Sequence, residues 1–401
     1  MSVAPKYPVL RPRLPTADKL LPYLERIDTA RWYTNGGPVL KEFEQKLADH
    51  FGVSEPCLVT SANATLAISQ ALRAVARPTG GLCVMPSWTF VASAAAAVWA
   101  GLEPYFIDIS EDSWTIRPED VLRLSAERPI SAVLVVASFG APLDLQEWDE
   151  FTRKSGIPVV VDAAGGFDAF RAEGGGWESE APVVISLHAT KVFGVGEGAA
   201  VIAKNQSLAQ RIARFGNFGF QGSRVAELPG TNAKMTEYSA AIGLAQFAEW
   251  PNTRNAWRRV TEAFVQEVGR VDGVRLAPQF GEGWVSSFGM VQFDESIPAE
   301  DVSAFLEGEG IETRQWWGKG CHCQRAYDQY PRSPLPVTRK LGQQVLGLPF
   351  WLGLESDDII SIASVLEEAI ASARAGQEVP RTMHGSIGSR ERYGATLKLA
   401  P

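Results

Sequence analysis

Hydrophobic residues recur with two different spacings along the first half of the chain. Short apolar runs, mostly containing Val or Ile, predict strands at residues 57–60, 82–85, 104–107, 132–137, 158–162 and 183–187. Between them, helical spacing of apolar residues predicts helices at residues 63–75, 90–100, 117–124 and 145–155. This alternation favours a three-layer α/β/α fold with a mainly parallel sheet. Residues 199–203 are predicted to add an antiparallel strand.

The pattern changes after residue 250. Residues 252–268 are predicted to be helical, and residues 285–293 to form a strand. Residues 356–371 combine an Asp-rich first turn with a stripe of Ile and Leu, which predicts an amphipathic helix. The expected organisation is a large domain over residues 1–250, a smaller C-terminal α+β domain over residues 251–380 and an extended tail over residues 381–401.

Composition narrows the function classes. The 401-residue chain has a formal net charge of -8, which does not support a nucleic-acid-binding role. No apolar run reaches the ~20 residues of a membrane helix, and the start lacks the apolar core of a secretory signal. Cys57 and Cys83 lie in apolar runs, and the adjacent Cys321, His322 and Cys323 lack a second ligand pair at zinc spacing. We therefore expect no metal and a reducing cytoplasmic location.

Two chemically suggestive residues follow predicted strands. Val159-Val160-Val161 ends in Asp162, and the strand at residues 183–187 leads to Lys191 and a glycine-rich turn. Ligands of open α/β sheets bind beyond the carboxyl ends of the strands, so both side chains are expected at one edge. A lysine amine condenses with the aldehyde of pyridoxal 5′-phosphate (PLP), and an aspartate keeps its pyridine nitrogen protonated. A capping aspartate and a surface lysine are the alternatives.

Nearby residues suit the rest of such a cofactor. Asn63 and Ala64 lie between a predicted strand and helix, where backbone N–H groups and the helix dipole bind phosphate. Ser186 precedes Lys191 by five residues and is placed to reach the same phosphate. Phe90 begins another helix and is placed to lie flat on a ring. A plain N-cap and a core aromatic are the alternatives for Asn63 and Phe90.

In this order along the chain, the motifs resemble the DegT/DnrJ/StrS family of PLP-dependent nucleotide-sugar aminotransferases, which have the aspartate-aminotransferase fold (fold type I). The most specific segments are S-x-H-x-x-K followed by G-E-G, and G-x-N-x-K-M-T-E. The motifs are Y-T-N-G-G-P at 33–38, S-A-N-A at 61–64, P-S-W-T-F at 86–90, D-A-A at 162–164, S-L-H-A-T-K at 186–191, G-E-G at 196–198, G-T-N-A-K-M-T-E at 230–237 and L-P at 348–349.

The resemblance implies a role for each matching residue. Lys191 forms the Schiff base with the cofactor and moves the proton, while Asp162 pairs with the pyridine nitrogen. Phe90 stacks on the ring. The phosphate is held by Asn63, Ala64 and Ser186, and by Asn232 from a neighbouring subunit of a homodimer with shared active sites. Contacts to sugar and nucleotide are expected from Arg314, Trp316, Trp317 and His322, although both tryptophans suit a core equally well.

Two positions depart from the family pattern. Gly165 stands where the family usually has a polar residue that contacts the phenolic oxygen of the cofactor. That contact is missing, supplied by water or made from elsewhere. Asn63 stands where the family more often has Thr, and it keeps the capacity to hydrogen-bond phosphate.

The resemblance implies transamination of a nucleotide-linked keto sugar, such as a dTDP- or GDP-4-keto-6-deoxyhexose, with L-glutamate as amino donor. Amination of a keto-cyclitol or of a 3-keto sugar uses the same machinery and stays open. A related 3-deoxygenation replaces the lysine by histidine, so Lys191 argues against it. A non-enzymatic regulator or scaffold would not need both Lys191 and Asp162.

Overall fold

A seven-stranded sheet forms the centre of the protein. A computed structural model describes residues 4–78, 81–172 and 179–376, and the tail predicted at residues 381–401 lies outside them. The strand order is β1-β7-β6-β5-β4-β2-β3, and β7 is antiparallel to both of its neighbours, as predicted. The strands are β1 Leu58–Ser61, β2 Leu82–Pro86, β3 Glu103–Ile107, β4 Ile130–Val136, β5 Val159–Asp162, β6 Val183–Ser186 and β7 Ala199–Ile202.

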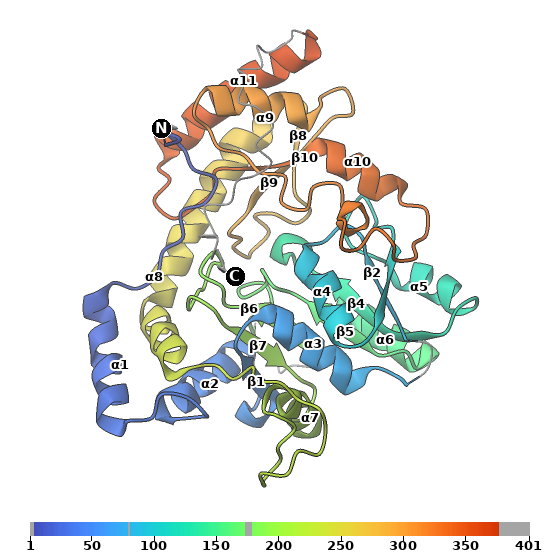
Figure 1. Ribbon diagram of the computed structural model, residues 1–401. Helices are drawn as coiled ribbons and strands as arrows, with labels where there is room; N and C mark the ends of the chain where they lie inside the picture. Colours follow the sequence, from blue (N-terminus) through green and yellow to red (C-terminus); the bar gives the residue numbers. More distant parts are fainter. Residues whose placement is uncertain (1–3, 79–80, 173–178, 377–401) are drawn as a thin grey trace, which may run out of the picture.

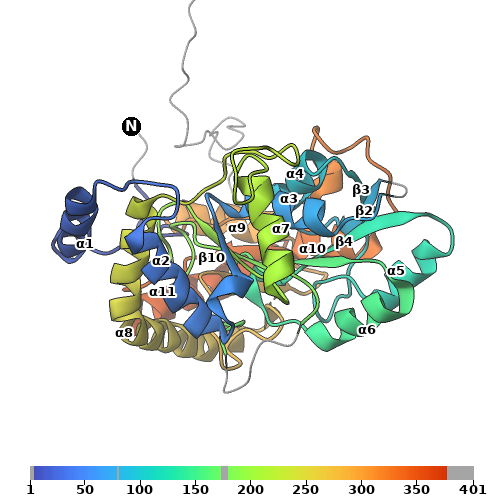
Figure 2. The ribbon, with the colours of Figure 1, turned by 90° about the horizontal axis from the view of Figure 1, so that it is seen from below.

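Helices cover both faces of this sheet (Figures 1 and 2). Side chains of successive strand residues point to opposite faces, so Val133 and Val161 join one buried cluster while Leu134 and Val160 join the other. The second cluster packs beneath α3, α4 and α7. The helices of the first 216 residues are α1 Ala17–Ala30, α2 Pro38–Phe51, α3 Ala64–Val75, α4 Val91–Trp99, α5 Pro118–Ser125, α6 Leu145–Ser155 and α7 Gln206–Gly216.

A second sheet lies in the C-terminal third of the chain. Its order is β10-β9-β8, with antiparallel pairing throughout. The N-terminal segment packs on this part of the protein, because Tyr7 pairs with Ile311 and the Phe350 amide donates to the Val9 carbonyl. The remaining elements are α8 Glu237–Glu267, β8 Val274–Leu276, β9 Gly289–Phe293, α9 Ala299–Gly308, α10 Pro336–Gln344, β10 Val345–Leu348 and α11 Ser356–Arg374.

Two predicted elements of this region have different bounds in the structure. The helix predicted at residues 252–268 is the second half of α8, which begins at Glu237 and continues through Pro251. The predicted boundary at residue 250 therefore falls inside one helix. The strand predicted to begin at residue 285 begins at Gly289, because the Val285 amide donates to the carboxylate of Asp168 and Ser286 bonds the Phe139 carbonyl.

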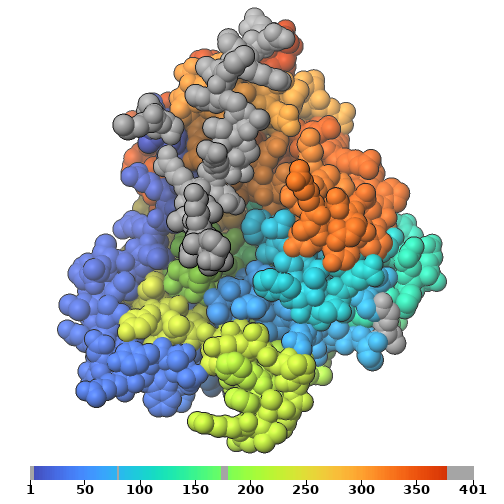
Figure 3. Space-filling model, viewed as in Figure 1, coloured from blue at the N-terminus to red at the C-terminus, as the bar shows by residue number. Residues whose placement is uncertain are grey.

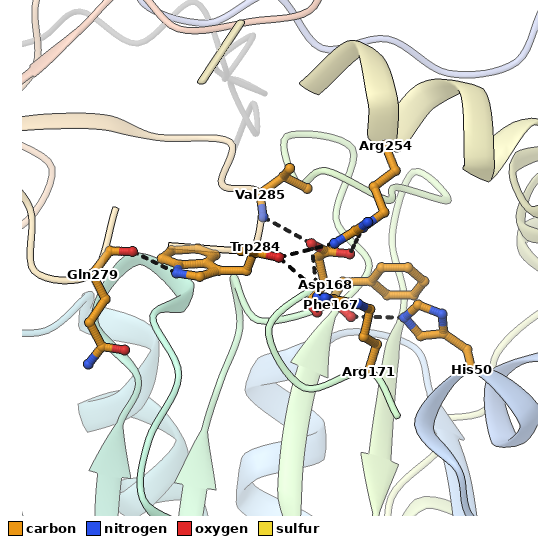
Figure 4. Close-up of polar contacts among 9 residues, drawn as sticks. His50, Phe167, Asp168, Arg171, Arg254, Gln279, Trp284 and Val285 are labelled. Atoms are coloured by element: carbon orange, nitrogen blue, oxygen red, sulfur yellow. Dashed lines mark hydrogen bonds and ion pairs between the residues drawn. The ribbon is translucent and has the colours of Figure 1, made fainter. Parts of the chain in front are cut away.

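A buried carboxylate joins the central sheet to the C-terminal region (Figure 4). Asp168 is 0% exposed and accepts from Arg254 Nε on α8 at 2.6 Å and from the Val285 amide at 3.0 Å. Arg171 Nη1 lies 3.2 Å from Oδ2, the oxygen that also accepts from the Val285 amide. The two arginines also donate to the carbonyl of Gly283. We call these five residues the Asp168 network; it anchors the segment that leads into β9.

Among the described residues, none of the helices is both long enough and apolar enough to cross a membrane.

Candidate active site

Asp162 and Lys191 lie at the same edge of the central sheet. Asp162 is the last residue of β5, which runs parallel to β6 with Asp162 opposite Val184. The chain leaves β6 at Ser186 and reaches Lys191 through a tight turn in which the Lys191 amide donates to the His188 carbonyl. The sequence prediction that one strand edge presents both side chains agrees with this geometry.

The carboxylate of Asp162 is buried and held by two donors. Its residue is 5% exposed; the Ser93 hydroxyl donates to Oδ2 at 2.7 Å and the Ala164 amide to Oδ1 at 3.2 Å. Ser93 in turn lies 2.8 Å from the Thr89 hydroxyl. Burial raises the pKa of Asp162, while Ser93, Ala164 and the charge of Lys191 oppose the rise. A cationic partner is what this buried carboxylate needs.

Lys191 is prepared to act as a nucleophile. Burial lowers the pKa of its amine to about 8, and the charge of Asp162 opposes the shift. Its Nζ lies 4.8 Å from the centre of the Phe288 ring, and no direct ion pair joins it to Asp162 in the described part of the chain. The lower pKa increases the neutral, reactive fraction of the amine near pH 7.

The N-terminus of α3 faces the loops that follow the strands. Asn63 is its N-cap, with Oδ1 accepting from the Leu66 amide at 3.0 Å. Its side-chain oxygen therefore caps the helix, while a contact between its amide nitrogen and phosphate stays a prediction. The amides of Ala64 and Thr65 keep no acceptor among the described residues, so they remain free for an anion. Ser186 Oγ accepts from the His188 amide, which leaves its O–H free to donate.

Phe90 is an exposed ring at the start of α4. It is 56% exposed, and Ser93, which bonds Asp162, follows one helical turn later. A planar ligand near Asp162 would cover this apolar ring.

Asn232 lies on an exposed loop, where its Oδ1 accepts from Lys234 Nζ at 2.6 Å. The carbonyl of the next residue, Ala233, accepts from the Ala62 amide, beside the N-cap of α3. The role of Asn232 in a neighbouring subunit stays a prediction.

Backbone packing explains the glycine at position 165. A Cβ added to Gly165 would lie 3.0 Å from the Gly140 nitrogen and the Phe139 carbonyl oxygen. Gly140 has φ 93°, and its own Cβ would lie 2.4 Å from the Gly165 oxygen. The two backbones thus occupy the space that a polar side chain at this position would need.

Aromatic rings extend from Lys191 into the C-terminal region. Phe288, below the Lys191 amine, contacts Trp316 at 5.2 Å between centroids. Trp317 stacks on Phe139 at 4.0 Å and meets Trp88 edge-on. Both Trp316 and Trp317 are partly buried against the main core, as the core alternative predicted. Phe288 and Phe139 were not predicted as site residues, because their contacts join segments that are distant in the chain.

Arg314 and His322 differ in accessibility. Arg314 is exposed, with its guanidinium 4.8 Å from the Trp316 ring centre. His322 is 6% exposed, and its Nδ1 lies 2.7 Å from Ser87 Oγ. Burial lowers the pKa of His322, helped by Arg332 and Arg339. In Figure 3 the orange segment that contains this residue lies against the cyan segment that carries α4. His322 therefore positions the Ser87 loop and is not open to solvent.

No group of three or more His, Cys, Asp or Glu residues that would suit a metal ion occurs in the described ranges.

These residues fit PLP. A buried carboxylate suits the pyridine nitrogen, a lysine of low pKa suits the aldehyde, free helix amides suit the phosphate and an exposed ring suits the face. The fold and the site together define an α/β enzyme that uses PLP.

Comparison with known proteins identifies the family. The model of the DegT/DnrJ/EryC1/StrS aminotransferase family matches residues 16–367. Protein Rv3402c of Mycobacterium tuberculosis (strain ATCC 25618 / H37Rv) is 31% identical over 92% of this chain and 91% of its own. The dTDP-4-amino-4,6-dideoxy-D-glucose transaminase of Shigella dysenteriae is 27% identical over 90% of this chain and 98% of its own. The crystal structure of DesI in the presence of its TDP-sugar product is 31% identical, with a TM-score of 0.82, over 94% of this chain and 95% of that chain.

The chain belongs to the DegT/DnrJ/EryC1/StrS aminotransferase family. It is a PLP-dependent aminotransferase. The predicted family, fold class, enzyme class and cofactor are thereby confirmed.

Proposed function

We propose that this aminotransferase moves the amino group of L-glutamate onto the keto carbon of a nucleotide-linked sugar, a dTDP- or GDP-4-keto-6-deoxyhexose. The observation that carries the proposal is the pair formed by a low-pKa lysine and a buried carboxylate at one sheet edge. Relatives named as a dTDP-sugar transaminase and as a GDP-perosamine synthase support the substrate class. Bound PLP supplies an electron sink for the carbon that loses its proton.

The residues of this chain perform the remaining tasks. Lys191 would hold the cofactor through its amine, and the same amine in its neutral form would be the base that moves the proton at the substrate carbon. Asp162 keeps the ring nitrogen protonated by opposite charge, and Ser93 fixes the orientation of its carboxylate. Phe90 covers one face of the ring, and Ala64 with Ser186 binds the phosphate. We also propose a homodimer in which Asn232 reaches the phosphate of the neighbouring site.

Two alternative reactions differ from the proposed one only in the acceptor of the amino group. A keto-cyclitol or a 3-keto sugar would use the same lysine and carboxylate, and only the sugar contacts would differ. The paired catalytic groups and the family give a non-enzymatic scaffold no support.

The cofactor and donor are tested by absorbance. The purified protein loaded with PLP is expected to be yellow, and L-glutamate is expected to bleach the visible band. Lys191→Ala should bind PLP without forming that band. A wild-type protein that stays colourless with added PLP would contradict the role of Lys191, and a band that L-glutamate leaves unchanged would contradict the donor.

The acceptor is tested on the glutamate-treated enzyme. Each member of a panel of nucleotide-linked keto sugars and keto-cyclitols is added, and the product is identified by mass and NMR. An amine at C4 of a nucleotide-linked 6-deoxyhexose is the expected product. Amination of a cyclitol alone would replace the proposal with the alternative.

A further inference from the structure

A small cavity lies beside the lysine that binds the cofactor. It has a volume of about 200 Å³, and its walls come from residues 10–16, from α8 and from the turn at residues 189–192, which includes Lys191. Trp351 and Ser287 also line it. Figure 1 shows the N-terminal segment, in blue, running beside α8. We call this space the arginine cavity, after Arg11 and Arg13 in its wall.

The arginine cavity carries a surplus of positive charge in an acidic protein. Besides Lys191, its lining includes Arg11, Arg13 and Lys19, but Glu249 is the one carboxylate among its lining residues. Glu249 is already paired with Lys19. Arg11 and Arg13 have no carboxylate partner in the described part of the chain. The chain as a whole has a formal net charge of -8, so this local excess is suited to an anion.

The segment that carries the arginines is fixed at several points. The Val9 amide donates to Glu312 Oε2 at 3.0 Å, and Trp351 Nε1 donates to the Pro8 carbonyl at 2.9 Å. The guanidinium of Arg11 lies 5.2 Å from the centre of the Trp351 ring. Arg11 is therefore held at the cavity wall by its stacking partner. A planar guanidinium presents two parallel N–H donors, which match the two oxygens of a carboxylate.

The volume of the arginine cavity, about 200 Å³, bears on whether it binds a small dicarboxylate donor or a nucleoside diphosphate. Pockets for larger ligands usually span about 300–1,000 Å³. A small dicarboxylate suits this volume better than a nucleoside diphosphate does.

We propose that the arginine cavity binds the amino donor, with Arg13 and Arg11 recognising its side-chain carboxylate while the amino group points toward Lys191. This inference rests on the proposed function and extends it, because it assigns residues to the donor and implies that the donor is a dicarboxylic amino acid. Arg13 supplies the more available guanidinium, since it has neither an ion pair nor a ring contact among the described residues.

Binding is tested without turnover. Glutarate has two carboxylates and no amine, so its affinity for the PLP-loaded protein is measurable by calorimetry. Arg13→Gln and Arg11→Gln should each raise the Kd of glutarate roughly tenfold, the effect of losing one charge-assisted hydrogen bond. Arg153→Gln, on exposed α6 and also without an ion pair among the described residues, is the matched control and should leave the Kd unchanged. Pentanoate, with five carbons and one carboxylate, should bind the wild type more weakly than glutarate.

Several results would overturn the proposal. If the wild type does not bind glutarate, or if all three variants bind it with the wild-type Kd, the arginines have no role in donor recognition. A loss of affinity for thymidine diphosphate, with unchanged affinity for glutarate, would assign the cavity to the nucleotide instead.

Bleaching of the visible band separates this inference from the proposed function. In the variants, L-glutamate should bleach the band with a higher half-saturating concentration and the same maximal extent. If glutarate binding depends on the arginines but L-glutamate leaves the wild-type band unchanged, the donor assignment fails while the carboxylate site stands. If no PLP band forms in the wild type, the proposed function and the inference both fail.

Discussion

Replacing Asp168 by Asn would test how the segment that leads into β9 is anchored. Asn keeps the shape of the side chain and an acceptor for the Val285 amide, but it removes the negative charge between Arg254 and Arg171. Asp168 is 0% exposed, and the two arginine side chains are 22% and 19% exposed. Asp168→Asn therefore removes the negative charge that lies between two largely buried guanidinium groups.

The expected loss follows from that arrangement. Removing one partner of a buried ion pair costs about 3–5 kcal/mol in the free energy of unfolding. Both guanidiniums keep a hydrogen bond to the Gly283 carbonyl and some contact with water, which places the loss near the lower limit. We expect about 3 kcal/mol, which corresponds to a ~100-fold change in the unfolding equilibrium constant.

Urea unfolding of the PLP-free protein, followed by far-UV circular dichroism and by tryptophan fluorescence, measures this change. Asp272→Asn is the matched control, because Asp272 pairs with Arg374 at 2.6 Å but its side chain is 88% exposed. Such a surface pair contributes about 0–1 kcal/mol. If the two variants lose the same stability, the buried network is not the anchor described here.

Three further changes test the site itself. Below pH 8, the rate at which PLP attaches to Lys191 should rise about tenfold per pH unit, because only the neutral amine reacts and burial lowers its pKa to about 8. Stopped-flow absorbance measures this rate. A rate that keeps rising up to pH 10 would contradict that pKa. Ser93→Ala removes the 2.7 Å donor to Asp162 and should weaken PLP binding roughly tenfold in equilibrium dialysis, while unchanged affinity would show that Ser93 is dispensable. Gly165→Ala forces a Cβ to 3.0 Å from two backbone atoms and should lower the free energy of unfolding by about 1–3 kcal/mol; a stability equal to wild type would show that the Gly140 backbone yields.

The central sheet was predictable because its signal is local. Each buried strand is a short apolar run between turns, and the alternation of Val133 and Leu134 between two clusters follows from the strand repeat. Asp162 and Lys191 were found for the same reason, since ligand sites of such sheets follow the strand ends.

Features that depend on distant segments gave no such signal. Asp168 and Arg254 are 86 residues apart, and nothing in either neighbourhood indicates the pair. The start of α8 was missed because the consecutive residues 243–246 are all buried, which obscures a one-sided stripe, and because the helix continues through Pro251, a residue type that usually ends a helix. Pro251 is accommodated inside the helix.

The charge states of Asp162 and Lys191 show what the site is adapted to. Burial raises the pKa of the carboxyl and lowers that of the amine, so each charged form is disfavoured in the cofactor-free fold. Between pH 8 and 10.5, the unfolded chain binds more protons at Lys191 than the native state does. Lys191 therefore lowers the free energy of unfolding below pH 8, and this penalty disappears as the pH rises to 10.5. Neither group is therefore placed for stability alone. Bound PLP would convert the Lys191 amine into an imine, which is a much weaker base, and a protonated ring would supply Asp162 with the cation it lacks. One ligand thus relieves both penalties, which is a physical reason for these two residues to occur together at this edge.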